Sequence, residues 1–297
     1  MKLVTFASTN GDKLGAIVDA GIMDLHEAGE RLGLSIPSGM QALIEAGPRS
    51  WDAAREAIEK LPEEAIAGEV QLRAPLPRPI RFRDSCLFLE HLEVSFKMAG
   101  MPFCEEFYRQ IIYYNADNVH IFGTGEDVPW PAASDDRDYE LEWACIIGKS
   151  GANISAEAAR DHIFGYTIFN DWSARDLQMP FMKGQLGPGA GKDFANSIGP
   201  CIVTADEIED PYALRMTAKV NGELWSDGST SSMHYSFDDA VRMLSADRPL
   251  VPGEIIGSGT VLSGCGFELG RQLSIGDVVE LEIEGIGCLR NRIVAAT

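Results

Sequence analysis

Two glutamates, one residue apart, open the segment of this chain that is best suited to chemistry. Residues 138–149 read DYELEWACIIGK. Because strand side chains point to alternate faces, Glu140 and Glu142 would share a face that Ala144 and Ile146 continue. Exposed carboxylates would form an ordinary solvated edge, whereas buried ones repel each other and need a proton or a cation. The pair therefore indicates either a solvated strand edge or a cation site.

Two further acidic residues lie in segments that could join this pair. Asp171 follows a predicted strand at Phe164–Phe169, and strand ends often carry ligands. Asp84 begins a predicted helix that stops at Gly100, and His91 would lie on the same face, ~10 Å along the axis. A base so placed could neighbour a metal without binding it. Ligand sets made only of oxygen select Mg²⁺, Mn²⁺ or Ca²⁺.

The elements that must position these residues are mainly strands, which predicts a β-rich α+β fold. No βαβαβ rhythm appears, and this disfavours a doubly wound sheet. Besides the helix that begins at Asp84, the helices predicted in this part of the chain are Ala156–His162 and Phe237–Leu244. The predicted strands are Tyr139–Ile147, Phe164–Phe169, Leu214–Val220, Val278–Ile283 and Cys288–Val294.

The first part of the chain has a different pattern and predicts a small α/β domain. Prolines 75, 77 and 79 alternate in RAPLPRPIR, and they enforce an extended chain typical of a boundary. We therefore expect a small domain over residues 1–72 and a catalytic domain over 73–297. The elements predicted before this boundary are strands Lys2–Ala7 and Leu14–Val18, a hairpin turn at Asn10-Gly11, and helices Gly39–Ala46 and Trp51–Leu61.

Composition narrows the possible partners. The net charge is −20, from 45 acidic and 25 basic residues, and such a surface repels nucleic acid and anionic membranes. No signal peptide or membrane-spanning stretch is recognised, and none of the six cysteines forms a CxxC pair. We expect a cytoplasmic protein with buried, reduced thiols that binds neither nucleic acid nor membrane.

The order of these segments resembles the fumarylacetoacetate hydrolase superfamily. Its pattern is D-x6-H, then E-x-E before an apolar strand ending in GK, then ND-x-S-x-R-D-x-Q, then a Gly/Pro loop with a lysine. The matching segments here start at Asp84, Glu140 and Asn170, and the loop GPGAGKDF carries Lys192. The segment GSGTVLSG is similar to the substrate-side Gly-Thr segment of the family. The likeness covers residues 80–295 and rests on several motifs in the right order.

The resemblance implies a role for each matching residue. The implied ligands of one divalent cation, Mg²⁺ or Mn²⁺ with Ca²⁺ as a further option, are Asp84, Glu140, Glu142 and Asp171. The implied catalytic groups are His91 as general base, Lys192, and Glu268 as a distant carboxylate that assists the histidine. The implied substrate contacts are Arg175, Gln178, Tyr114 and Thr260. The family also implies a mixed β-roll behind a small N-terminal domain, a homodimer, and a small keto acid as substrate.

Two positions depart from the family pattern and leave the reaction open. Val94 stands where some relatives carry a glutamate partner for the histidine. Met182 stands near the position at which some hydrolases carry a tyrosine that binds the substrate carboxylate. We expect a metal-dependent hydrolase that cleaves a C–C bond in a 1,3-diketo acid or acylpyruvate. The alternatives are a decarboxylase, isomerase or dehydratase of 2-keto acids and, from another class, a non-catalytic protein that holds a divalent cation structurally.

Overall fold

Strands dominate the part of the chain that the computed structural model describes, which is residues 1–9, 11–64, 66 and 70–296. The strands are β1 (Lys2–Ser8), β2 (Gly11–Val18), β3 (Gly21–Asp24), β4 (Leu72–Arg73), β5 (Arg81–Ser85), β6 (Tyr113–Asn115), β7 (Ile121–Phe122), β8 (Asp127–Trp130), β9 (Arg137–Asp138), β10 (Leu141–Ile147), β11 (Ile163–Asn170), β12 (Ser173–Ala174), β13 (Asn196–Thr204), β14 (Arg215–Val220), β15 (Glu223–Ser229), β16 (Glu254–Gly257), β17 (Val278–Ile283) and β18 (Gly287–Ala295). The α-helices are α1 (Leu25–Leu32), α2 (Met40–Ala46), α3 (Pro48–Lys60), α4 (Leu89–Met98), α5 (Ala156–Ala159), α6 (Arg175–Lys183), α7 (Phe237–Leu244) and α8 (Gly266–Leu269). Short 3-10 helices are η1 (Glu105–Tyr108), η2 (Arg160–His162), η3 (Gly189–Gly191), η4 (Ala205–Glu207) and η5 (Thr230–Ser232).

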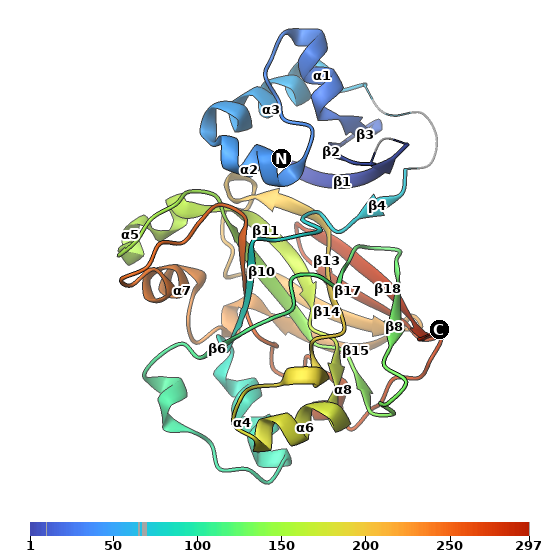
Figure 1. Cartoon of the computed structure of the whole chain (residues 1–297), viewed down its shortest axis with the longest axis vertical. Coiled ribbons are helices and arrows are strands. Elements are labelled where there is room, and N and C mark those ends of the chain that lie inside the picture. Colours follow the sequence, from blue (N-terminus) through green and yellow to red (C-terminus); the bar gives the residue numbers. More distant parts are fainter. Residues whose placement is uncertain (10, 65, 67–69, 297) are drawn as a thin grey trace.

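Two sheets form the centre of the molecule (Figure 1). The larger sheet has the strand order β3-β2-β1-β13-β11-β10-β16-β5-β6, and a second sheet has the order β15-β14-β17-β18-β8. The predicted alternation along β10 is confirmed, because Trp143 and Cys145 pack into one buried cluster whereas Ala144 and Ile146 pack into another. The strand-rich mixed fold expected from the sequence is therefore the fold that the chain adopts.

The N-terminal strands extend the larger sheet, and α1, α2 and α3 lie at one end of the molecule (Figure 1). Strand β1 pairs antiparallel with β13, so Leu3 faces Ile202 across the ladder. The sequence patterns missed β3 and α1, although Asp24 caps that helix by accepting a hydrogen bond from the Glu27 N–H. Residue Asn10 of the expected hairpin turn lies outside the described residues, and the division after residue 72 stays a prediction.

The helix predicted to start at Asp84 is wrong. Asp84 lies in β5, which pairs with β16 on one side and β6 on the other, and helix α4 begins only at Leu89. The sheet takes up the backbone hydrogen bonds of this segment and overrides its local pattern. The helix at Phe237–Leu244 is confirmed, and Ser236 and Asp239 form a capping box at its start.

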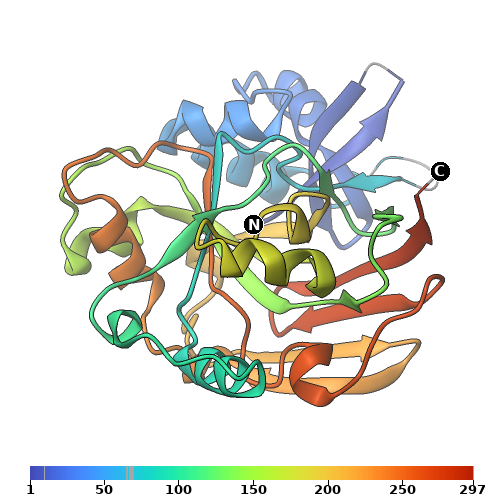
Figure 2. The same cartoon turned by 60° about the horizontal axis from the view of Figure 1, so that its bottom comes forward.

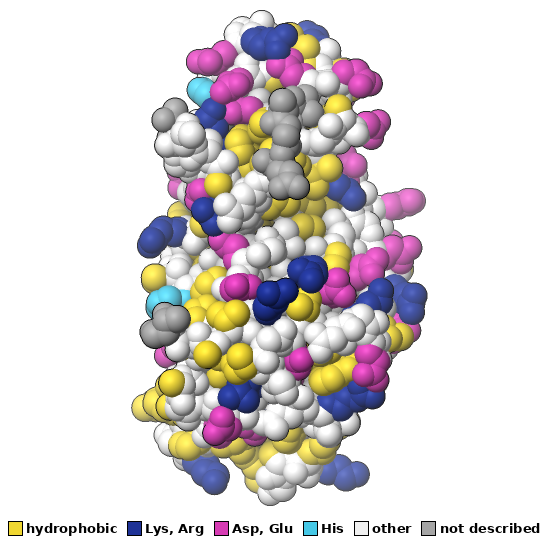
Figure 3. All heavy atoms as spheres, turned by 90° about the vertical axis from the view of Figure 1, so that its right-hand side faces the viewer, with side chains coloured by type: hydrophobic (Ala, Val, Ile, Leu, Met, Phe, Trp, Pro, Cys, Tyr) yellow, Lys and Arg dark blue, Asp and Glu magenta, His cyan; other side chains and the backbone are white. Residues whose placement is uncertain are grey.

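The surface mixes charges of both signs, as the face in Figure 3 shows. Every helix within the described ranges is too short or too polar to cross a membrane. All six cysteines are free, but Cys104 and Cys288 are exposed, which corrects the expectation that every thiol is buried. Cys104 directly precedes η1, and Cys288 is the second residue of β18. These positions, and not the residue type, decide the exposure of the two thiols.

Candidate active site

A cavity of about 390 Å³ is lined by residues of α4, α6 and α8. These helices gather at the end of the molecule opposite α1–α3 (Figures 1 and 2). We call it the main cavity. All the residues with implied roles line it except Glu268, whose carboxylate lies behind His91. The segments 95–112 and 179–190 supply part of its wall, and they are partly helical because α4 ends at Met98 and α6 continues to Lys183.

Three buried carboxylates converge at the inner end of the main cavity. Asp84, Glu142 and Asp171 each offer an oxygen within 4.8 Å of the others, and each side chain belongs to a buried residue. Glu142 Oε2 and Asp171 Oδ1 have no hydrogen-bond partner among the described residues. Unpartnered buried carboxylate oxygens that face one another fit a hard divalent cation, so this group passes the chemical test for a metal site.

Neighbouring strands bring this carboxylate group together. Asp84 projects from β5 opposite Gly257 of β16, and a Cβ at Gly257 would lie 2.5 Å from Asp84 Oδ1. The N–H of Gly259 donates to the same oxygen over 3.2 Å. Glu142 lies on β10, which is hydrogen-bonded to both β16 and β11, and Asp171 follows the end of β11 as predicted.

Burial and mutual repulsion raise the pKa values of these carboxylates. Burial, followed by the charge of Asp171, raises the pKa of Asp84 to about 7. Burial likewise raises the pKa of Asp171 to about 6, although Lys192 opposes the shift. The pKa of Glu142 lies well above its usual value, from burial and then the charge of Asp84. A divalent cation would relieve all three shifts by replacing the bound protons.

Glu140 shares the strand face of Glu142 but contacts cations. Its carboxylate accepts from Arg175 Nη2 over 2.8 Å and forms an ion pair with Lys192, which also contacts Asp171. Burial opposes ionisation, yet Lys192 and Arg175 hold the pKa of Glu140 below its usual range. The structure therefore brings Glu140 next to the carboxylate group but outside it, and its role as a fourth ligand stays a prediction.

His91 and Glu268 form a buried pair beside these carboxylates. His91 Nδ1 lies 2.8 Å from Glu268 Oε2, and the two side chains are 10% and 2% exposed. Glu268 also lies 3.5 Å from Cys265 Sγ. Because burial raises the pKa of Cys265 well above its usual value, the thiol stays protonated and donates to the carboxylate. The distant carboxylate that the resemblance implied thus reaches the histidine from α8.

Two predicted substrate contacts bind the carboxylates themselves. The Tyr114 hydroxyl donates to Asp171 Oδ2 over 2.7 Å, and Thr260 Oγ1 donates to Glu142 Oε1 over 3.0 Å. Both groups line the main cavity, so each orients a carboxylate and remains within reach of a bound molecule. Their predicted roles as substrate contacts are not settled by these bonds.

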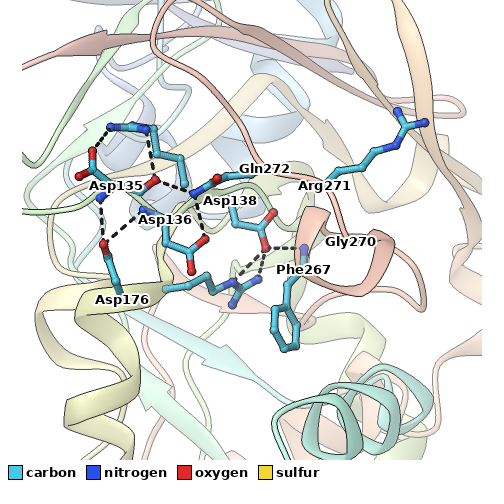
Figure 4. Close-up of a pocket in the computed structure, with 10 residues that line it drawn as sticks. Asp135, Asp136, Asp138, Asp176, Phe267, Gly270, Arg271 and Gln272 are labelled. Carbon is cyan, nitrogen blue, oxygen red and sulfur yellow. Dashed lines mark hydrogen bonds and ion pairs between the residues drawn. The ribbon is translucent and has the colours of Figure 1, made fainter.

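Asp138 is a buried residue of the site that the sequence interpretation passed over. It accepts from Arg175 through Nε (2.9 Å) and Nη2 (2.6 Å), and from the N–H groups of Gly266 (2.6 Å) and Phe267 (3.1 Å). Figure 4 shows the bond between Asp138 and the Phe267 N–H, in a second hollow of about 480 Å³ that Arg175 also lines. The signal was available, because Asp138 stands two residues before Glu140 and continues its alternation.

The remaining predicted contact, Gln178, lies one turn along α6. Its Oε1 accepts a hydrogen bond from Arg175 Nη1 over 3.1 Å, so the amide oxygen is directed at the guanidinium group. Arg175, Gln178 and Lys192 thus form a polar row along the main cavity next to the carboxylates. A cavity that joins buried acids, a histidine–glutamate pair and cationic groups is the site of an enzyme that acts on a small polar molecule.

Known proteins identify the class more closely. The family described as fumarylacetoacetate (FAA) hydrolase C-terminal matches residues 86–294. The oxaloacetate tautomerase YisK of Bacillus subtilis is 36% identical over 227 residues, which are 76% of this chain and 73% of that protein. The human mitochondrial oxaloacetate tautomerase FAHD2A is 32% identical over 230 residues, covering 76% and 70% of the two chains.

Solved structures agree over the whole chain. A putative HpcE protein from Mycobacterium smegmatis superposes with a TM-score of 0.80 at 27% identity, covering 100% of both chains. A fumarylacetoacetate hydrolase from Exiguobacterium antarcticum gives 0.78 at 28% identity, covering 99% of both. The chain belongs to the fumarylacetoacetate hydrolase family of enzymes, as its motifs implied.

Proposed function

We propose that this enzyme stabilises the enolate of a small keto acid at a divalent cation and cleaves a C–C bond in an acylpyruvate or another 1,3-diketo acid. The observation that carries the proposal is that the His91–Glu268 pair lies beside the carboxylate group in one cavity. A base next to a cation site is what enolate chemistry requires.

Asp84, Glu142 and Asp171 would hold the cation, with Glu140 joining them if Lys192 moves toward the substrate. Mg²⁺ and Mn²⁺ suit these oxygen ligands, and Ca²⁺ is a further option. When bound, the ion supplies Lewis-acid stabilisation of negative charge on the keto-acid oxygens.

The cationic side chains would bind the substrate. Arg175 already gives Nε and Nη2 to Asp138 and Glu140 and one Nη1 N–H to Gln178. Its second Nη1 N–H would therefore be the donor for a substrate carboxylate. Lys192 is buried, and its attraction to Asp171 and Glu140 raises its pKa despite burial. It therefore stays charged and would stabilise the oxyanion of the leaving enolate.

His91 would act as the base. Glu268 would accept a hydrogen bond from Nδ1–H, so Nε2 would take a proton from water. The resulting hydroxide would add to the distal carbonyl of the substrate. The bond between that carbonyl carbon and C3 of the pyruvate unit then breaks, and its electron pair becomes the enolate. The proton held by His91 returns to C3, so an acylpyruvate and water give a carboxylic acid and pyruvate.

A second candidate function is keto–enol tautomerisation or isomerisation. It is favoured by the relatives named oxaloacetate tautomerases, which align over 76% of this chain. The same base would then remove a proton from C3 and return it to oxygen or another carbon, with no attack by water. A decarboxylase would use the same enolate stabilisation.

The test is product analysis after removing and restoring metal. We expect excess EDTA to abolish turnover of acetylpyruvate, Mg²⁺ or Mn²⁺ to restore it, and acetate and pyruvate to form in equal amounts. Oxaloacetate assayed in parallel distinguishes tautomerisation, followed by enol absorbance, from decarboxylation, followed by CO₂ release. Full activity in EDTA contradicts the metal role. Absence of turnover of any keto acid with every divalent metal favours the non-catalytic binder.

A further inference from the structure

The outer part of the main cavity is apolar, in contrast to its charged inner end. Leu92 and Phe96 of α4, Met101 and Phe107 of the following segment, and Met179 and Met182 of α6 line it. Phe107 is buried, and the others are half-buried although they face an open space. A wall of this composition removes apolar surface of a bound molecule from water.

Aromatic packing braces this wall. The rings of Phe96 and Phe107 lie edge to face with centroids 5.7 Å apart, and Phe103 contacts both from behind, at 5.7 Å and 5.4 Å. Such clusters hold each ring in place more firmly than burial of area alone. The wall is therefore a formed surface and does not have to be assembled around the ligand.

The charges around the cavity exclude a second carboxylate from this outer part. Among the described lining residues, Arg175 and Lys192 are the lysine and arginine side chains, and both contact acids at the inner end. Glu90, Glu93 and Glu105 are exposed on α4 and η1. A carboxylate against the apolar wall would lose water without gaining a cation.

We propose that the main cavity selects a keto acid whose distal substituent is an uncharged alkyl chain or aryl ring, in preference to a dicarboxylic keto acid. This deepens the proposed function and rests on it. The head of the substrate occupies the charged end, and the substituent lies between α4 and α6. A volume of about 390 Å³ falls within the ~300–1,000 Å³ typical of ligand pockets. That leaves space beyond the keto-acid head for such a group.

Binding without turnover tests the substituent directly. Calorimetry with saturating Mg²⁺ would compare pyruvate, 2-oxobutanoate, 2-oxohexanoate and 2-oxooctanoate with oxaloacetate. We expect affinity to rise roughly fourfold per added methylene until the wall is covered. Oxaloacetate should bind more weakly than 2-oxohexanoate. Affinity that is flat or falls with chain length, together with tight binding of oxaloacetate, overturns the inference.

An introduced positive charge tests the apolar wall. Met182→Arg places a cation opposite α4, and we expect it to weaken 2-oxohexanoate binding about tenfold and to strengthen oxaloacetate binding. The matched control is Leu186→Arg, because Leu186 is 93% exposed on the same segment and lies outside the cavity lining. Met182→Ala is a milder variant that should weaken only the long-chain acids. If neither Met182 variant changes the preference between these acids, the wall does not select the substrate.

Turnover separates this inference from the proposed function. With Mn²⁺, kcat/KM for acylpyruvates of growing acyl length should rise in the same order as affinity. Turnover that is greatest for oxaloacetate and falls with acyl length contradicts the inference but leaves a keto-acid enzyme. Absence of turnover for every keto acid, with chain-length-dependent binding retained, contradicts the proposed function and leaves the binding preference standing.

Discussion

At the scale of single residues, the bond between His91 and Glu268 determines which ring nitrogen can work as a base. With the proton on Nδ1, the Glu268 carboxylate accepts a hydrogen bond from Nδ1–H over 2.8 Å, which leaves the Nε2 lone pair as the base. The carboxylate then stabilises the imidazolium that forms. Neither residue belongs to the group of Asp84, Glu142 and Asp171. Substitutions can therefore change the proposed base without changing the expected ligands of the cation.

We predict that His91→Ala lowers kcat by about 10²–10⁴ and leaves Mn²⁺ affinity unchanged, because the proposed role of the imidazole is to move protons while Asp84, Glu142 and Asp171 hold the cation. Glu268→Gln should lower kcat less, since the amide still accepts a hydrogen bond but carries no charge. Steady-state kinetics and Mn²⁺ titration of both variants are the measurements. Loss of Mn²⁺ binding in His91→Ala would show that the role assigned to this residue is wrong.

Gly257 offers a second residue-scale test. A methyl group there would meet Asp84 Oδ1 at 2.5 Å and the ring of Phe169 at 3.2 Å, so Gly257→Ala must displace the carboxylate. We expect metal affinity to fall roughly 10–100-fold, as for other residues that orient ligands. Gly39→Ala is the control, because nothing lies within 4 Å of a Cβ at that position. Equal metal affinity in both variants would contradict the expected displacement.

At the scale of elements, Asp138 ties three parts of the site together. From β9 it binds Arg175 at the start of α6 and the first N–H groups of α8, the helix that carries Glu268. Figure 4 shows its bond with the Phe267 N–H. A buried carboxylate that holds both Arg175 and the helix carrying the partner of His91 can align them. Asp138 is a positioning residue in this arrangement.

Two substitutions separate its contacts. Asp138→Asn keeps an oxygen for the Gly266 N–H but loses the ion pair with Arg175, so we expect KM to rise about 10–100-fold with kcat nearly unchanged. Asp138→Ala loses both contacts and should lower kcat as well. Asp135→Asn is the control, because that side chain is fully exposed beside Arg137. Equal effects of both Asp138 variants on KM and kcat would mean that the residue only supports the fold.

The elements also show what the sequence could predict. Alternation predicted a shared face for Glu140 and Glu142, and both line the main cavity although β10 begins only at Leu141. The Asp171 position followed from the end of β11, which is likewise a local property. The strand containing Asp84 was missed because its pairing partners, β16 and β6, are distant in sequence. Glu268 came from family likeness alone, since no local pattern links it to a histidine 177 residues away.

At the scale of the molecule, an acidic protein places two cationic side chains at the inner end of its main cavity. The chain carries a net charge of −20, yet Lys192 is buried and Arg175 is half-buried beside the carboxylates of that cavity. The three carboxylates Asp84, Glu142 and Asp171 nevertheless outnumber these two cations. Without a divalent ion, their raised pKa values favour the bound proton. Folding, proton binding and cation binding are therefore coupled in this protein.

The last prediction follows from the sign of that coupling. The folded-state pKa values of Asp84 and Asp171, about 7 and about 6, lie above the ordinary 3.8, so these two side chains bind more protons in the metal-free folded protein than in the unfolded chain. These groups thus favour the fold at low pH, and this contribution is lost as the pH rises from about 4 to about 7. In EDTA, Tm should therefore fall between pH 5 and pH 8, apart from the effects of other groups. Saturating Mg²⁺ should raise Tm at pH 8 by roughly 5 °C and by much less at pH 5. Scanning calorimetry with and without Mg²⁺ at both pH values measures this, with the exposed Glu105→Gln variant as control. A Mg²⁺-induced shift of equal size at both pH values would contradict proton–cation exchange at the carboxylate group.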